Sequence, residues 1–148
     1  MPILKAFPKR PLGGPVDPVL AGWLDLIWQL IKSDQYTPVC TAVTNVDACS
    51  GQLSEYCRIG DGAIAFGAVE IDPTAGGGAA TTIRFSLPIP SNLVSNFHLV
   101  GWAFTNSDNT ARITADTTNN EAQLDLVGGA GFTASRRFFF FMFYRIIQ

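Results

Sequence analysis

A run of large apolar side chains near the C-terminus constrains the fold more than any other feature of this sequence. Residues 136–148 read RRFFFFMFYRIIQ, with four consecutive phenylalanines followed by Met142, Phe143 and Tyr144. Seven apolar residues bounded by arginines are too few for a membrane-spanning helix, which needs about 20. Phenylalanine and tyrosine favour the pleated surface of a β-strand. We therefore expect this segment to form a strand.

Such a strand has two apolar faces, because successive side chains point to opposite sides. One face carries Phe138, Phe140, Met142, Tyr144 and Ile146, and the other carries Phe139, Phe141, Phe143, Arg145 and Ile147. One face can line a core, and the other needs cover, either from copies of the chain or from loops and an apolar helix of the same chain. We favour self-association, because exposed apolar patches of this size are rare on monomers. The expected oligomer interface comprises Phe139, Phe141, Phe143 and Ile147.

Composition and charge narrow the class of protein. The chain has 148 residues, of which 47% are hydrophobic and 15% charged, and its net charge is −2. This length suits one domain plus an appendage, and the charge argues against general affinity for nucleic acid. Cys40, Cys49 and Cys57 are odd in number and lack CxxC spacing. We expect reduced structural thiols in a cytosol-assembled protein rather than a disulfide or a metal site.

The first 35 residues are expected to form an arm and a helix that attach the protein to a partner. Residues 1–16 carry Lys5, Lys9 and Arg10 without an acid, and their prolines and glycines indicate an extended arm rather than a signal peptide. Residues 17–33 suit a helix so apolar that it must be buried, against its own domain or against symmetry mates or a host surface. The candidate anchor residues are Ile3, Leu4, Phe7, Leu20, Trp23, Leu24, Ile27, Trp28 and Ile31.

From Tyr36 onward the pattern changes to short strands separated by turn-forming clusters such as DACSG, IGDG and DTTNN. Strands are expected at 36–47, 52–59, 63–71, 81–87, 97–104, 111–116, 121–127 and 137–147. Without intervening helices they predict an antiparallel arrangement. The expected protein is mainly β, with a jelly-roll-like β-sandwich over residues 36–148 that follows the extended arm and the one N-terminal helix.

The order of several short motifs resembles a β-sandwich domain found at the C-terminal ends of tailed-bacteriophage virion proteins. The motifs lie in YTPVCTAVTNV, YCRIGDGAIAFGAVEIDPTAGGG and TTIRFSLPIPSN. They comprise the aromatic-Thr-Pro at Tyr36, the Thr-Asn-Val ending at Val46, the Tyr-x-Arg-hydrophobic-Gly ending at Gly60, and the Ser-Leu-Pro ending at Pro88. The resemblance covers about residues 36–148. It departs from the family in having Tyr36 where tryptophan is usual, and it excludes residues 1–35.

The resemblance implies a three-fold symmetric virion component that is assembled in the bacterial host cytoplasm. The expected protein is a homotrimeric projection or decoration, tied to capsid or tail proteins through residues 1–35. The alternative is a receptor-binding tail-fibre protein that contacts host-surface carbohydrate. Aromatic side chains on the loops would favour this alternative, but the loops read as rich in serine, threonine, asparagine and glycine.

The candidate chemical groups do not indicate an enzyme. His98 has no nucleophile context, and strand alternation places it with Val100 and Trp102, opposite Phe97 and Leu99. Glu70 and Asp72 could share a side of a strand, but a solvated residue and a turn explain them more simply. The glycine-rich loop DPTAGGGAATT lacks the Gly-Lys-Ser/Thr ending of a phosphate-binding loop. We expect no catalytic residue, metal, cofactor, nucleic acid or membrane partner.

Overall fold

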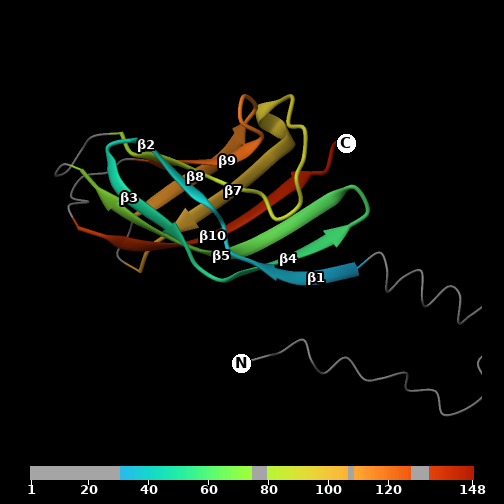
Figure 1. The fold of residues 1–148 in the computed structure, drawn as a ribbon, viewed down its shortest axis with the longest axis horizontal. Coiled ribbons are helices and arrows are strands. Elements are labelled where there is room, and N and C mark those ends of the chain that lie inside the picture. Colours follow the sequence, from blue (N-terminus) through green and yellow to red (C-terminus); the bar gives the residue numbers. More distant parts are fainter. Residues whose placement is uncertain (1–30, 75–79, 107–108, 128–133) are drawn as a thin grey trace, which may run out of the picture. The chain divides into compact units, whose positions relative to one another are not determined.

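A computed structural model describes residues 31–74, 80–106, 109–127 and 134–148 (Figure 1). In these residues the protein is mainly β, as the sequence predicts, and every strand pairs with its neighbours in the antiparallel direction. The elements are β1 (Ile31–Tyr36), β2 (Cys40–Thr44), β3 (Val46–Gly51), β4 (Ser54–Ile59), β5 (Gly62–Pro73), β6 (Thr82–Phe85), the 3-10 turn η1 (Asn96–His98), β7 (Leu99–Phe104), β8 (Thr110–Asp116), β9 (Glu121–Val127) and β10 (Arg136–Arg145).

The strands form one sheet that curls back on itself. Its order is β1-β4-β5-β10-β7-β8-β9-β6-β2, and β3 pairs with β5. Only Asn45 separates β2 from β3, and its φ of 53° gives the chain a sharp local bend. Because β2 pairs with β6 and β3 with β5, this bent pair joins distant parts of the sheet (Figure 1).

The curl encloses one hydrophobic core. The rings of Phe85 on β6 and Phe140 on β10 lie 5.1 Å apart between centroids, although β7, β8 and β9 separate these strands within the sheet. One face of the C-terminal strand lines this core, as expected for a strand with two apolar faces: Phe138, Phe140, Met142, Tyr144 and Ile146 are at most 7% exposed. The hydroxyl of Tyr144 donates to the carbonyl of Ile89 at 3.0 Å and accepts from its N–H at 2.9 Å. Burial raises the pKa of Tyr144 to about 12, so this hydroxyl remains a donor.

The boundary between the expected helix and the sheet differs from the prediction. Residues 31–33 belong to β1 rather than to a helix, because their backbone pairs with β4 from Ile31 opposite Ile59 to Tyr36 opposite Ser54. Among the described residues the sheet therefore includes Ile31, which lies before the expected start of the strands at Tyr36. The remaining helix, the arm and the other candidate anchor residues lie outside the described residues.

Two further local predictions were wrong. The DACSG segment, expected as a turn, lies within β3, because the bend falls earlier, at Asn45. Phe97 and His98, expected in a strand, form η1 instead. The Ser95 side chain accepts a hydrogen bond from the Phe97 N–H at 3.3 Å, and the His98 N–H donates to the Ser95 carbonyl at 3.0 Å. These bonds hold a turn, so strand alternation begins only at Leu99.

Candidate assembly surface

The outer face of β10 is aromatic and accessible. Phe139, Phe141 and Phe143 are 44%, 53% and 46% exposed, whereas the residues between them are buried. These three side chains therefore face away from the core, and their role in an oligomer interface stays a prediction. Their strand lies between β5 and β7 rather than at an edge of the sheet (Figure 1).

The neighbouring strands extend this apolar face. Phe141 lies directly between Phe66 on β5 and Trp102 on β7, because both are its register partners. Side chains opposite each other on antiparallel strands are close enough to pack together. Phe139 is opposite Phe104, and their ring centroids are 6.1 Å apart. We call the accessible group the aromatic surface; it comprises Phe66, Val100, Trp102, Phe104, Phe139, Phe141 and Phe143.

Small residues on the inner face explain why so much aromatic bulk points outward. The large core side chain of Phe140 is flanked by Gly67 on β5 and Ala103 on β7. Met142 is flanked in the same way by Ala65 and Gly101. At these positions the side chains of β10 fill the core beneath all three strands, and β5 and β7 place the aromatic side chains of Phe66 and Trp102 on the outside.

Charged residues border the aromatic surface. Glu55 on β4 is the register partner of Phe66, and Arg112 on β8 is the partner of Trp102. At one end, Arg137 forms an ion pair with Glu70 at 3.8 Å. An apolar centre with a polar rim is the usual anatomy of a protein–protein interface.

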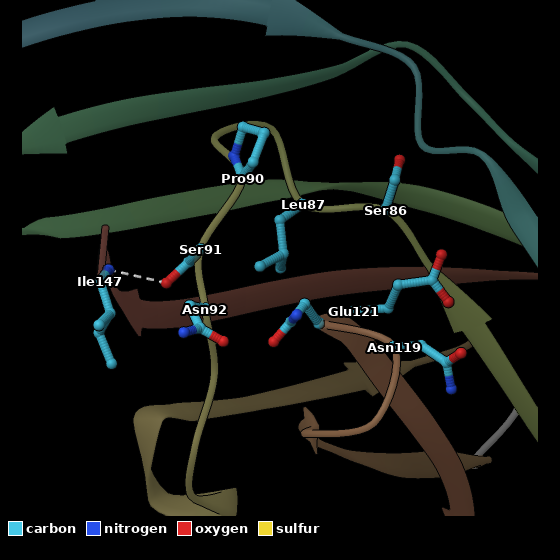
Figure 2. A pocket seen from close by; sticks show the side chains of 9 residues that line it. Ser86, Leu87, Pro90, Ser91, Asn92, Asn119, Glu121 and Ile147 are labelled. Carbon is cyan, nitrogen blue, oxygen red and sulfur yellow. Dashed lines mark hydrogen bonds between the residues drawn. The ribbon is translucent and has the colours of Figure 1, made fainter.

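Ile147, the fourth residue of the expected interface, lies apart from the three phenylalanines. It follows the end of β10, and its N–H donates to the Ser91 hydroxyl at 2.8 Å. It lines a pocket of about 510 Å³ together with Pro90, Asn92 and Glu121 (Figure 2). The Ser91 hydroxyl in turn donates to the Arg145 carbonyl at 2.8 Å, so these bonds fix the chain end. Ile147 therefore belongs to this pocket.

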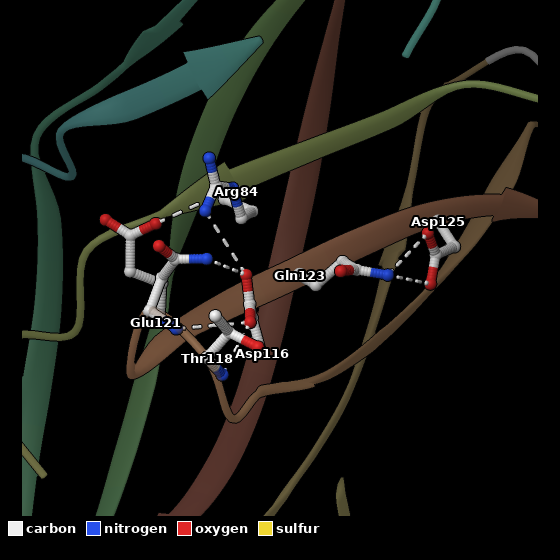
Figure 3. Close-up of polar contacts among 7 residues, drawn as sticks. Arg84, Asp116, Thr118, Glu121, Gln123 and Asp125 are labelled. Atoms are coloured by element: carbon white, nitrogen blue, oxygen red, sulfur yellow. Dashed lines mark hydrogen bonds and ion pairs between the residues drawn. The ribbon is translucent and has the colours of Figure 1, made fainter. Parts of the chain in front are cut away.

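A network of polar side chains covers the part of the sheet near β6 and the β8–β9 turn. Arg84 donates to Asp116 at 3.3 Å and lies 3.9 Å from Glu121 (Figure 3). Burial opposes ionisation of Asp116, but hydrogen bonds from Asn119, Thr118 and Arg84 outweigh it and lower the pKa of the carboxyl. Asp116 therefore stays ionised and holds the β8–β9 turn.

The three cysteines lie in surroundings that suit structural thiols rather than reactive ones. Cys40, Cys49 and Cys57 are free and half-buried. Burial, assisted by Cys49, raises the pKa of the Cys40 thiol to about 12, so it is not a reactive thiolate near neutral pH.

Glu70 accepts a hydrogen bond from the Ser135 hydroxyl at 3.0 Å, and Asp72 is exposed. Across the described ranges, no group of three or more His, Cys, Asp or Glu side chains could hold a metal ion. No helix in that part of the chain is long and apolar enough to span a bilayer.

Sequence reasoning identified one strand of the aromatic surface and missed the other two. Phe66, Val100, Trp102 and Phe104 were not expected in an interface. The alternation in the segment that begins at Leu99 carries part of the signal, since it places Val100 and Trp102 on one face. Recognising a shared surface, however, requires the knowledge that β7 and β5 flank β10.

The chain was compared with protein-family models, with curated proteins and with solved structures, and none of the three comparisons found a match.

Proposed function

We propose that this protein is a bacteriophage virion structural protein that forms a short trimeric projection or decoration on the particle. The observation that best supports the proposal is the aromatic surface, because covering it with a second copy of the chain would remove exposed apolar area from water. The role needs no catalysis and no cofactor. The virion context, the assembly in the host cytoplasm and the three-fold symmetry come from the resemblance, and attachment to capsid or tail proteins is assigned to the N-terminal segment.

The size of the aromatic surface supports self-association. Its six aromatic side chains are each about half exposed. Full burial of an aromatic side chain removes about 200 Å² from water, so covering the exposed halves removes roughly 600 Å² per chain. At about 25 cal/mol per Å² this is worth on the order of 15 kcal/mol per chain as an upper bound. The area lies at the upper end of apolar patches on monomers and approaches the roughly 800 Å² per partner of a standard interface.

The proposal includes a jelly-roll-like sandwich as the finer fold class. The packing of Phe85 on Phe140 supports it, since β6 and β10 meet across the core rather than through sheet hydrogen bonds. In this arrangement β5, β10 and β7 present the aromatic surface on the outside of one layer, where a second copy can reach it.

Phe141→Asp should convert trimers to soluble monomers, because it places a charge at the centre of the aromatic surface. The measurement is the mass in sedimentation or light scattering of the full-length protein. Phe97→Asp is the matched control, since Phe97 is 95% exposed outside the aromatic surface, and this variant should remain trimeric. A wild-type protein that sediments as a monomer at micromolar concentration, or a Phe141→Asp variant that stays trimeric, would contradict the proposal.

Deleting residues 1–30 should yield a folded trimer that no longer enters phage particles, because the proposal assigns attachment to this segment. The cut is placed before Ile31 so that β1 keeps its pairing with β4. Incorporation is measured by the amount of the protein in purified particles, with the full-length chain as the reference. Normal incorporation of the shortened chain would refute the anchor role, and loss of the trimer would assign the segment to self-association instead.

A further inference from the structure

A groove separate from the centre of the aromatic surface lies between η1 and the outer faces of β7, β8 and β9. Its volume is about 760 Å³, within the range of roughly 300–1,000 Å³ typical of small-molecule sites. Val100 borders both the groove and the aromatic surface. The residues that give the groove its chemistry are Phe97, Arg112, Thr114, Gln123 and Asp125.

Phe97 presents an almost free aromatic ring at this groove. Its side chain is 95% exposed and adds nothing to the core. The bond from its own N–H to the Ser95 hydroxyl holds the short turn that displays it. Phe97 thus lies in a turn between strands, whereas the sequence predicted that it belongs to a strand. An exposed ring in a held turn is a ready apolar platform for a flat ligand.

Other residues that line the groove are polar and hold one another in place. The Asp125 carboxylate accepts a hydrogen bond from the Thr82 hydroxyl at 2.9 Å. It also accepts two from the Gln123 amide, at 3.0 and 3.1 Å (Figure 3). Arg112 lies 4.0 Å from the same carboxylate, and its side chain is 60% exposed. At this distance and exposure its guanidinium keeps N–H donors for a ligand.

We infer that this groove binds a neutral oligosaccharide, with a sugar ring stacked on Phe97 and its hydroxyls bonded to Arg112 and Asp125. A pyranose has a flat apolar face, and each hydroxyl both donates and accepts, so it needs an aromatic platform beside fixed donors and acceptors. The two carboxylates of Asp116 and Asp125 outnumber the one guanidinium of Arg112 among the groove's lining residues, so a strongly anionic ligand gains no net attraction. Sugar binding would be a second function, separate from the proposed structural role. It does not depend on the trimer, because the groove can bind a ligand whether or not another copy covers the aromatic surface.

The test is binding of the full-length protein to an array of neutral oligosaccharides built from hexoses and N-acetylhexosamines, with sialylated counterparts on the same array. We expect binding to neutral members. Phe97→Ala and Arg112→Ala should each weaken that binding at least about tenfold, and Phe97→Trp should retain it because the platform remains. Val94→Ala is the matched control, since Val94 is an exposed residue before η1 that does not line the groove.

Sedimentation of the same variants separates this inference from the proposed function. Phe97→Ala should lose the sugar and keep the trimer, whereas Phe141→Asp should lose the trimer and keep the sugar. Absence of binding across the array, binding only to sialylated members, or equal binding by Phe97→Ala and the wild type would each overturn the inference. Loss of the trimer in Phe97→Ala would also overturn it, because the groove would then belong to the contact between copies.

Discussion

Replacing Phe140 with alanine should lower the free energy of unfolding by about 3–5 kcal/mol, the usual cost of removing a buried phenylalanine. Phe140 is 3% exposed, and its ring packs on Phe85 across the core. Its partners on the adjacent strands are Gly67 and Ala103, which are too small to fill the space. The cavity left by the ring should therefore persist, which places the cost in the upper part of the range.

Chemical denaturation measures this loss, and a Phe141→Asp background keeps self-association from contributing to the stability. Phe97→Ala in the same background is the control, because it makes the same substitution at a side chain that is 95% exposed. It should change the free energy of unfolding by less than about 0.5 kcal/mol. Similar losses for the two variants would mean that Phe140 does not lie in the core.

Gly101→Ala should destabilise the protein by about 3 kcal/mol or more and prevent β7 from pairing normally with β10. A methyl group at this position would lie 2.5 Å from the Phe141 carbonyl oxygen and 2.8 Å from Cβ of Met142. The nearest obstacle is backbone, which moves only if the ladder between the two strands opens. Overpacking of this kind commonly costs 1–3 kcal/mol even where side chains can adjust.

The measurement is again denaturation, supported by hydrogen exchange of the β7 amides. Gly62→Ala is the matched control, because the atom nearest its added methyl, at 2.9 Å, belongs to the Phe143 ring, which can swing aside. It should cost clearly less than Gly101→Ala. A Gly101→Ala protein with normal stability and normal amide protection would show that the strands are farther apart than described.

The sequence predicted those features that depend on local patterns. Alternation along residues 136–145 identified which side chains share a face, because successive residues of a strand point to opposite sides. It did not decide which of the two faces lines the core, because both are apolar. Turn-forming residues located most strand ends, because their backbone preferences are also local. Asn45 was missed because its bend depends on β2 and β3 pairing with different strands, a tertiary constraint that overrides the apparent continuity of residues 36–47.

The assembly surface and the groove were harder to predict because both depend on which strands become neighbours. Phe66, Trp102 and Phe141 are far apart in the sequence, and no periodic pattern within a strand predicts that they lie side by side across the sheet. Phe97 was placed in a strand because apolar alternation continues through it, whereas the Ser95 side chain diverts the backbone into a turn. The Phe97 N–H can bond either to the Ser95 side chain or to a neighbouring strand, and the tertiary structure as a whole decides between the two.

The position of β1 affects how far an assembly of this chain can grow. β1 ends the sheet order, and within the described ranges it pairs only with β4, so no described strand covers its other side. An uncovered strand edge can template pairing with another chain. Asp34 and Gln35 are solvent-exposed there, and the strand is short, as in proteins that avoid fibril formation. Lateral polymerisation is therefore disfavoured. The proposed trimer adds no further copies once its ring of contacts closes, so the edge at β1 is a part of the sheet that must not pair with other chains if the assembly is to stay small.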